Sequence, residues 1–308
     1  MSLNSPNCWR WRANTRSCAR STQNATTHNS RLSESPNRVF SHPQTTDRIR
    51  FIHVLATGKI VSRTLCIANQ KGGVGKTTTS INLASGLATA GHSVLLVDMD
   101  PQCNATSGLG IEPVKHHPLI ANTPIRHSVL ATSIPHLDVL PGSGSFRDAD
   151  TLANSDESTT QIVVEHLRSG AMIYDYVLID CPPSLGALTR AALSASNEVV
   201  LPIQCEYFAM EGLTQMIGVI KEVMLERPGE LTFGGIVLTM YDESLELTNE
   251  VDADLRQFFG EVVFDTVIPR DVHVAEAPSH GLSVLDYAPR CRGSRAYTEL
   301  CMEILERD

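Results

Sequence analysis

The sequence has no run of 18 or more apolar residues and no C-x-x-C pair. The first absence argues against a membrane-spanning helix, and the N-terminus lacks the continuous apolar stretch of a secretory signal. The eight cysteines are scattered along the chain, so their spacing argues against metal ligation and against a disulfide framework, and it favours a reducing cytoplasm. A hydrophobic content of 42% and a charged content of 19% are typical of a globular protein.

Positive charge is scarce outside the first 60 residues. That segment carries eight Arg and one Lys against Glu34 and Asp47, a net charge of +7. Because the whole chain has a net charge of −9, the remaining 248 residues carry −16. An acidic body of this kind is a poor general binder of nucleic acid.

Residues 1–57 are rich in Ser, Asn, Thr and Arg and poor in aliphatic side chains. Such a segment cannot bury enough apolar surface to offset its ordering entropy, so a disordered N-terminal extension is expected, followed by one folded domain over 58–308. Three interpretations are open: a basic tail that touches nucleic acid or acidic lipid, an Arg-rich targeting sequence, or a non-native start. The third arises because the first Met after Met1 is Met99, so a true start near Val61 would need a non-AUG codon.

From residue 59 onward, short apolar runs alternate with amphipathic helical patterns. This alternation predicts an α/β fold with a doubly wound, mostly parallel sheet. The predicted strands are nearly continuous in apolar residues, as strands buried on both faces should be; they are 64–68, 93–98, 176–180, 198–203, 234–240 and 262–268. The predicted helices are 77–90, 185–195, 209–226, 248–259 and 293–306. Segment 110–160 is the least regular, and no second-domain boundary is visible.

The run 71-KGGVGKTT-78 lies between the first predicted strand and the first predicted helix, the context that a phosphate-binding loop requires. Gly72, Gly73 and Gly75 let backbone N–H groups converge on phosphate oxygens, and the helix N-terminus adds to that field. We expect Lys76 to reach the terminal phosphates and the Thr77 hydroxyl to ligate Mg²⁺. A glycine turn that merely connects strand and helix is a weak alternative, because Lys-Thr follows it.

A second lysine, Lys71, stands at the start of this loop, where a phosphate loop has no required base. A lysine there lies on the rim and points away from the nucleotide of its own loop. It could be a solvated surface lysine, or it could reach a second nucleotide if another subunit faced it. The loop alone leaves the two interpretations comparable.

Further segments of the chain resemble the ParA family of partition ATPases, in particular its chromosomal, Soj-type members. The segments are 97-VDMDPQCNATSGLG-110, 179-IDCPPSLGALTRAAL-193, 203-IQCEYFAMEGL-213 and 268-IPRDVHVAEAPSHG-281. The resemblance runs from about residue 60 to the C-terminus. It implies a phosphate-loop fold of the deviant Walker A (SIMIBI) class, with ATP and Mg²⁺ as ligands. The residues implied to bind the nucleotide phosphates are Lys71, Gly72, Gly73, Val74, Gly75, Lys76, Thr77 and Thr78.

The same resemblance implies a slow ATP hydrolase that forms a homodimer on binding ATP. Two subunits of such a protein enclose two ATP molecules, and Lys71 would cross to the phosphates of the partner subunit. It would act there as the counterpart of an arginine finger and couple hydrolysis to dimerisation.

Carboxylates follow two of the predicted strands, at the strand ends where ligands bind in this architecture. The resemblance makes Asp100 the residue that orients or deprotonates the attacking water, with Lys71 and Lys76 completing the catalytic set. Asp180 is implied to be the Walker B residue, which holds Mg²⁺ through water beside Thr77. For Asp98 we favour a structural hydrogen bond.

The chain departs from the family pattern in two segments. Cys103 stands where the family usually has glycine, so a Cβ and a thiol replace a residue that tolerates φ > 0; we expect a stiffer switch and slower hydrolysis. Pro269 and Asp271 occupy the positions implied to contact adenine, but Asp271 replaces an asparagine and removes an amide donor. His273 stands where a family arginine is common and is largely neutral at pH 7.

Resemblance to Soj-type proteins also implies nonspecific DNA binding by the ATP dimer, stimulation by a ParB-like centromere-binding partner, and a cytoplasmic, nucleoid-associated location. The candidate DNA contacts are Arg270, Arg290, Arg292 and Arg295. The alternative for these arginines is surface ion pairing with the many Glu and Asp residues, which the acidic body favours.

Other classes fit the sequence less well. A MinD-like membrane ATPase ends in a basic amphipathic helix, whereas this chain ends 301-CMEILERD-308, so no membrane partner is expected. An iron–sulfur ATPase would need paired cysteine ligands beside Cys181. A kinase or synthetase would need a second substrate that no motif identifies. An ATP-gated protein that positions a protein cargo without strong DNA binding stays open as the main alternative.

Overall fold

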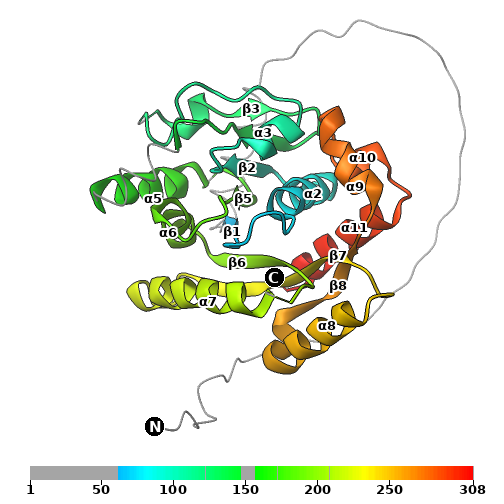
Figure 1. Cartoon of the computed structure of the whole chain (residues 1–308). Helices are drawn as coiled ribbons and strands as arrows, with labels where there is room; N and C mark the ends of the chain where they lie inside the picture. The colour runs from blue at the N-terminus through cyan, green and yellow to red at the C-terminus, as the bar shows by residue number, and fades with distance from the viewer. Residues whose placement is uncertain (1–61, 122, 147–156, 172, 208, 308) are drawn as a thin grey trace, which may run out of the picture. The chain divides into compact units, whose positions relative to one another are not determined.

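An eight-stranded sheet forms the centre of the fold (Figure 1). The computed structural model describes residues 62–121, 123–146, 157–171, 173–207 and 209–307. The strand order is β3-β4-β2-β5-β1-β6-β7-β8, in which β3 pairs antiparallel with β4 and the other pairings are parallel. The strands are β1 (Arg63–Ile67), β2 (Val94–Asp98), β3 (Leu130–Ala131), β4 (Leu137–Leu140), β5 (Tyr176–Asp180), β6 (Glu198–Gln204), β7 (Thr232–Tyr241) and β8 (Val263–Pro269).

Helices follow most of the strands and cover both faces of the sheet. The α-helices are α2 (Lys76–Thr89), α3 (Asn104–Gly108), α5 (Glu157–Ala171), α6 (Ala187–Ala195), α7 (Ala209–Glu226), α8 (Glu246–Phe259), α9 (Val272–Glu276), α10 (Val284–Tyr287) and α11 (Arg292–Glu306). Three single turns of 3₁₀-helix are η1 (Ile125–His127), η2 (Gly260–Val262) and η3 (Ala277–His280). Among these described helices, none combines the length and the apolar character needed to cross a bilayer.

This architecture confirms the predicted doubly wound α/β fold. Each of the six predicted strands and five predicted helices is present, with ends shifted by a few residues. The elements that the sequence did not predict are β3, β4, the short helices and α5, and several of them fall in the irregular segment 110–160. The expected extension, residues 1–57, lies outside the described residues.

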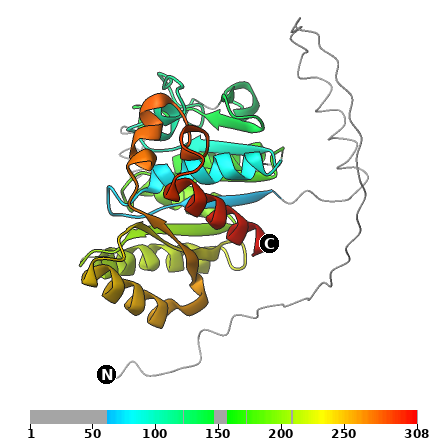
Figure 2. The same ribbon diagram turned by 90° about the vertical axis from the view of Figure 1, so that its right-hand side faces the viewer.

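Alternation along the strands divides the buried side chains between two cores. Leu65 and Ile67 of β1 face α2 and α11, whereas Cys66 between them faces the layer formed by α5, α6 and α7. Strands β2 and β5 are buried along their whole length. Figure 1 shows helices on the two sides of the sheet, and in Figure 2 α2 (cyan) and α11 (red) lie on the face turned toward the viewer. The near-continuous apolar runs of the sequence therefore reflect strands that pack on both faces.

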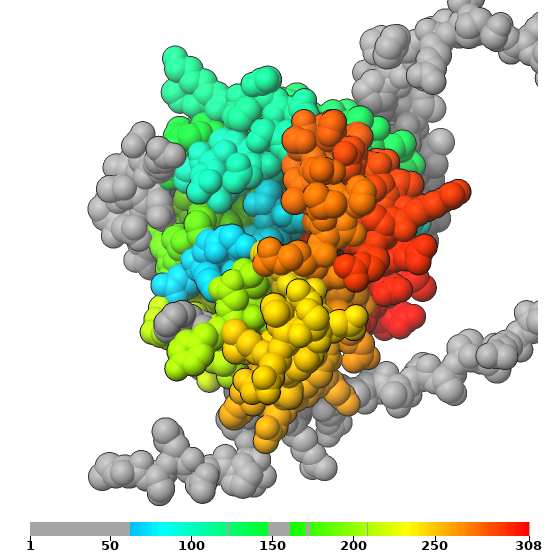
Figure 3. Space-filling model, turned by 45° about the vertical axis from the view of Figure 1, so that its right-hand side comes forward, coloured from blue at the N-terminus to red at the C-terminus, as the bar shows by residue number. Residues whose placement is uncertain are grey.

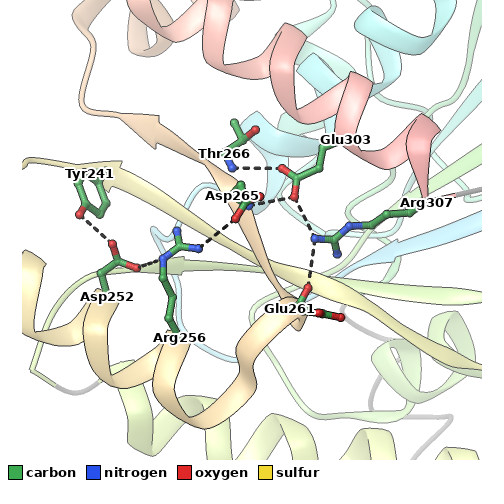
Figure 4. Close-up of polar contacts among 8 residues, drawn as sticks. All are labelled: Tyr241, Asp252, Arg256, Glu261, Asp265, Thr266, Glu303 and Arg307. Atoms are coloured by element: carbon green, nitrogen blue, oxygen red, sulfur yellow. Dashed lines mark hydrogen bonds and ion pairs between the residues drawn. The ribbon is translucent and has the colours of Figure 1, made fainter. Parts of the chain in front are cut away.

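A polar network fastens the edge strand β8 to its two neighbouring helices (Figure 4). The carboxylate of Glu303 on α11 accepts hydrogen bonds from the backbone N–H groups of Asp265 (2.9 Å) and Thr266 (3.1 Å), and Arg307 donates to Glu303 at 2.9 Å. On the α8 side, Arg256 pairs with Asp252 at 2.6 Å and lies 3.7 Å from Asp265. Two backbone N–H groups of the edge strand are thus hydrogen-bonded to one side chain of α11.

The phosphate loop leaves β1 at the centre of the sheet, between β5 and β6. Strand order reverses at β1, with β5 and β2 on one side and β6 and β7 on the other. Because these strands are parallel, the loops that follow β1, β2, β5 and β7 leave the same edge of the sheet. Ligands bind at the carboxyl ends of the strands near such a reversal of strand order. The fold therefore places the predicted site residues of these loops along one edge.

Gly86 in the middle of α2 packs so closely on α11 that no side chain fits. A Cβ there would overlap the sulfur of Cys301 and lie 3.6 Å from Leu285 Cδ2. We expect Gly86→Ala to lower the free energy of unfolding by about 1–3 kcal/mol through overpacking. Urea denaturation would measure this. Gly218 in α7, where a Cβ meets no atom within 4 Å, is the matched control, and Gly218→Ala should raise stability by up to about 1 kcal/mol. A stabilising Gly86→Ala would contradict the packing described.

Candidate functional site

Two glycines shape the loop between β1 and α2. Gly73 has φ +76° and Gly75 has φ +86°, a left-handed conformation that side-chain-bearing residues rarely adopt. The Thr239 hydroxyl of β7 donates a 2.8 Å hydrogen bond to the Val74 carbonyl, which fixes the loop against the sheet. The backbone therefore holds the open turn that the sequence predicts for a phosphate-binding loop.

Lys76 is folded into this loop and is only 6% exposed. Its Nζ donates a 2.9 Å hydrogen bond to the Lys71 carbonyl. Burial lowers the pKa of Lys76, and the nearby carboxylate of Asp180 opposes that shift. A buried ammonium at the mouth of a glycine-rich turn is well placed to meet an anion.

Lys71 lies on the rim of the loop, and its side chain is 33% exposed. Its Nζ forms an ion pair with Glu206, which follows β6. The backbone N–H of Lys71 donates to Asn69 Oδ1 at 3.0 Å, so the start of the loop is fixed while the side chain runs along the surface. The two lysines thus occupy different environments: Lys76 lies within its own loop and Lys71 outside it.

A fully buried carboxylate, Asp180, lies under the first turn of α2. It accepts a 2.8 Å hydrogen bond from Thr77 Oγ1 and a 2.9 Å hydrogen bond from Ser80 Oγ. In the sheet Asp180 is in register with Asp98 of β2, which is also fully buried. Burial raises the pKa of Asp98 to about 6 and that of Asp180 to about 8. The negative charges of Asp98 and Asp100 add to the rise at Asp180, and the charge of Asp100 adds to the rise at Asp98. Hydroxyl and carboxylate oxygens together are the ligands that Mg²⁺ prefers, so the donor set fits that cation.

The turn after β2 is held by hydrogen bonds to Asp98. Its Oδ2 accepts from the Thr106 N–H at 2.8 Å and from the Thr106 hydroxyl at 2.6 Å. Asp98 therefore has the structural bonding that the sequence favours for it. Asp100 stands at the head of the turn, 5% exposed, and accepts from the Gln102 N–H at 2.9 Å.

Cys103 in this turn has φ +55°, the left-handed region in which a Cβ is strained by roughly 1–2 kcal/mol. The family pattern has glycine at this position. Glycine tolerates a positive φ, so the backbone conformation here is the one that the family pattern predicts. The chain tolerates the strain because hydrogen bonds from Thr106 to Asp98 and from the Cys103 N–H to the Asp100 carbonyl determine the turn.

His117 supports the same turn from segment 110–160 and has no counterpart among the predicted site residues. Its Nδ1 accepts from the Leu119 N–H at 3.2 Å, so its Nε2–H donates to the Asp98 carbonyl at 3.2 Å. The ring packs on Phe146 with centroids 3.8 Å apart. Burial lowers the pKa of His117 to about 3, and the ring stays neutral. No sequence motif could have identified it, because its contacts depend on tertiary structure.

A groove of about 380 Å³ opens beside the phosphate loop, between α2, α3 and η3. It is lined by Thr77, Thr78, Ile81, Asn104, Ser107, Gly108, Pro278 and Ser279. Figure 3 shows this face, with the phosphate loop in blue between the segment after β2 in teal and the α9–η3 segment in orange.

The two predicted adenine contacts lie outside the lining of this groove. Pro269 ends β8, in register with Tyr241 of β7. Asp271 caps α9: its Oδ1 accepts from the His273 N–H and its Oδ2 from the Gly293 N–H, each at 3.0 Å. Both oxygens of Asp271 are engaged within the chain.

The four candidate DNA contacts are exposed and lie at neighbouring chain segments. Arg270 follows β8, and Arg290, Arg292 and Arg295 lie at the start of α11, which the Asp271–Gly293 hydrogen bond ties to the β8–α9 turn. Within the described part of the chain, none of the four forms an ion pair. Hydrogen bonds from Ser244 lower the pKa of Asp242, and the charges of Arg270 and Arg292 add a smaller effect in the same direction. The described residues therefore do not form the surface ion pairs that are the alternative role for these arginines.

Known proteins similar to this chain cover the same folded region. Residues 62–233 match a family model described as an AAA domain. The chain is 45% identical over 251 residues to the chromosome-partitioning ATPase Soj of Treponema pallidum, covering 80% of this chain and 99% of that protein. It is 44% identical over 254 residues to the chromosome partitioning protein ParA of Caulobacter vibrioides, covering 80% and 95%. The chain belongs to the ParA/Soj family of chromosome-partitioning ATPases.

Solved structures agree with this ParA/Soj assignment at the level of fold. The cell division ATPase MinD of Pyrococcus furiosus is 26% identical, covers 80% of this chain and all of that one, and superposes with a TM-score of 0.66. Cobyrinic acid a,c-diamide synthase of Mycobacterium smegmatis, with bound ADP and magnesium, is 30% identical over 80% of this chain and 95% of that one, with a TM-score of 0.69.

In this ParA/Soj protein, several residues that hydrogen-bond to the site were not predicted from the sequence. They are Asn69, Ser80, Thr106, His117, Glu206 and Thr239. Ser80 offers a usable signal, because it follows Thr77 by three residues on one face of a helix that starts at a phosphate loop. The others come from distant segments.

The neutral, buried His117 should make this protein sensitive to acid. Its folded pKa of about 3 lies below the unfolded value of about 6.5. Below pH 6.5 the imidazole is protonated in the unfolded chain but not in the folded chain. The free energy of unfolding therefore falls as the pH drops below 6.5. We expect His117→Asn to remove about 2 kcal/mol of the stability lost between pH 7.5 and pH 5.0, as measured by urea denaturation at both values.

His280→Asn, an exchange at an exposed ring, is the control for that measurement. Nitrogen NMR of labelled histidine tests the same point without a variant. One ring should keep its Nε2–H tautomer from pH 7.5 to 5.0, and a His117 resonance that titrates in this interval would contradict the assignment.

Proposed function

We propose that this protein is a Mg·ATP-dependent partition ATPase that dimerises face to face on binding ATP and hydrolyses it slowly. The observation that carries the proposal is the contrast between two lysines of one loop. Lys76 is buried inside the loop, whereas Lys71 lies on its rim and is paired with Glu206 on the surface. Chromosome-partitioning relatives 42–45% identical to this chain support the same interpretation.

In the first step, the phosphate loop binds the nucleotide. Backbone N–H groups around Gly73 and Gly75 and the start of α2 receive the phosphates, and Lys76 turns from the Lys71 carbonyl toward them. Thr77 and Asp180 would hold Mg²⁺, which supplies charge neutralisation at the phosphates when it is bound. The M. smegmatis synthase with ADP and magnesium supports these ligands.

In the second step, Lys71 leaves Glu206 and reaches the nucleotide of the partner subunit. The ion pair it gives up is partly exposed and is worth about 1 kcal/mol or less, so the exchange costs little. A crossing ammonium would stabilise the charge that develops on the transferred phosphoryl group. This requirement makes hydrolysis depend on the dimer.

In the third step, Asp100 orients or deprotonates the attacking water. Its turn is held by Asp98, Thr106 and His117 and strained at Cys103, so we expect slow intrinsic hydrolysis. A ParB-like partner would accelerate the reaction by reshaping this turn.

For DNA, we propose that the exposed arginines at the α11 start form the phosphate-contacting surface of the dimer, in a cytoplasmic, nucleoid-associated protein. Their lack of described ion-pair partners supports this role. The acidic body opposes it, and positioning of a protein cargo is the alternative that this charge favours.

The first experiment uses Asp100→Ala, which should hydrolyse ATP far more slowly than the wild type and so trap the dimer. Sedimentation with Mg·ATP should show a dimer for this variant and a monomer for Asp100→Ala/Lys71→Ala, while ATP binding is retained in both. Asp100→Ala/Glu206→Gln removes the intrachain ion pair without changing side-chain size. Its dimer should be at least as stable as that of Asp100→Ala, with a dissociation constant lower by up to about fivefold for each Lys71 released.

Asp100→Ala/Lys115→Ala, which loses an exposed lysine elsewhere, is the control for lost charge. An Asp100→Ala variant that hydrolyses ATP at the wild-type rate would show the catalytic assignment to be wrong. A dimer that survives the loss of Lys71 would show the crossing role to be wrong.

DNA binding is tested with Arg292→Ala/Arg295→Ala in the Asp100→Ala background. We expect weaker retention on a nonspecific duplex and a salt slope reduced by about 0.9 for each DNA phosphate that is no longer neutralised. Arg190→Ala, whose side chain is paired with Glu222 and Glu226, should leave retention unchanged. A chain lacking residues 1–57 separates the contribution of the basic extension. If the dimer forms but ignores DNA at physiological salt, the cargo-positioning alternative gains.

A further inference from the structure

Three potential metal ligands meet where α9 and α11 begin. Asp271 and His273 stand at the start of α9, and Cys291 is the residue before α11. A carboxylate oxygen, an imidazole nitrogen and the thiol sulfur all lie within 4.8 Å of one another. In the sequence Cys291 is 18 residues from His273, a spacing that matches no metal-binding motif. The fold, and not the spacing, brings the three together.

Hydrogen-bonding protons now occupy the space between these atoms. His273 Nδ1 lies 2.9 Å from Asp271 Oδ1, and the Cys291 sulfur lies within 4.8 Å of the same carboxylate. In a tetrahedral zinc site, bond lengths of 2.0–2.3 Å would place neighbouring ligand atoms about 3.3–3.6 Å apart. The three groups would therefore need movements of only about 1 Å to exchange their shared protons for one divalent cation.

Backbone donors hold two of the ligands in place. The Gly293 N–H bonds Asp271 Oδ2 at 3.0 Å, which leaves Oδ1 directed toward His273 and Cys291. The Ser294 N–H donates to Cys291 Sγ at 3.2 Å, and the positive N-terminal end of α11 favours a thiolate at that sulfur. Supporting donors of this kind orient the ligands in protein metal sites.

Exposure and charge are compatible with a cation. The side chain of Asp271 is 8% exposed and that of His273 is 47% exposed, so the cluster is open to solvent on the His273 side. Burial of Asp271 is outweighed by hydrogen bonds from Gly293 and His273, which lower its pKa to about 2 and keep it anionic. Burial, together with this carboxylate, raises the pKa of the Cys291 thiol, so a cation must displace its proton. Arg270 and Arg292 flank the cluster but are exposed and screened.

We propose that Asp271, His273 and Cys291 form a binding site for a divalent cation of the zinc type, with a fourth position open to water or an outside ligand. One oxygen, one nitrogen and one sulfur ligand suit Zn²⁺ and do not suit Mg²⁺, which requires oxygen ligands. The site is separate from Thr77 and Asp180. A bound cation joins the β8–α9 turn to the start of α11. A cation site at Cys291 would also differ from the expectation, based on cysteine spacing, that the cysteines of this chain ligate no metal.

Cobalt absorption spectroscopy tests the site without nucleotide. The untagged full chain would carry Cys8→Ser and Cys18→Ser, so that thiols of residues 1–57 do not contribute. We expect one equivalent of Co²⁺ to give a thiolate-to-cobalt charge-transfer band that one equivalent of Zn²⁺ removes. Cys291→Ser should abolish the band, and His273→Asn should weaken Co²⁺ binding by about tenfold or more. His280→Asn and Cys205→Ser, outside the cluster, should change neither.

A second measurement needs no substitution in the cluster. One equivalent of Zn²⁺ should slow alkylation of Cys291 by iodoacetamide, read by mass spectrometry of its peptide. The proposal is overturned if Co²⁺ gives no charge-transfer band, if the band survives Cys291→Ser, or if Zn²⁺ leaves the alkylation rate of Cys291 unchanged. None of these outcomes bears on ATP binding or dimerisation, so the two proposals stand or fall separately.

Discussion

The hydrogen bonds of one buried carboxylate organise the site. Asp180 accepts from Thr77 and Ser80, both in the first turn of α2, and its own strand lies between β2 and β1 at the centre of the sheet. The helix that begins at the phosphate loop is thereby fixed to the strand that carries the carboxylate. A buried charge left without such partners would cost several kcal/mol, so the position of the loop and the position of Asp180 determine each other.

The same arrangement explains why the surrounding residues are so strongly coupled. Asp98 lies beside Asp180 in the sheet, and its carboxylate holds the turn that carries Asp100. His117 then holds the backbone of Asp98 from a distant segment. A cation bound near Thr77 would relieve the repulsion between these carboxylates, and the turn would feel the change through Asp98. In the proposed function, the neighbouring strands β2 and β5 would connect the nucleotide site to the turn that carries Asp100.

The sequence predicted the parts of this protein that depend on local pattern. Apolar runs predicted the strands, and Gly73 and Gly75 predicted the open turn between β1 and α2, because its backbone requirements lie within eight residues. Phosphate binding by this turn stays a prediction. The sequence did not predict β4 or His117, because a short strand of four residues carries little periodicity and a buried histidine has no linear signal. Glu206 was out of reach for the same reason: its partner Lys71 lies 135 residues away.

The edge strand β8 has a consequence for how copies of this chain can associate. A bare strand at the edge of an open sheet is a template on which an identical sheet can add, and the addition can repeat without limit. Here Glu303 accepts hydrogen bonds from the backbone N–H groups of Asp265 and Thr266, where the register between β7 and β8 is irregular. The opposite edge, β3, is only two residues long. Continuous strand-by-strand growth into a filament is disfavoured at both ends of the sheet. Self-association is left to surfaces other than the strand edges, where it can close after a fixed number of subunits.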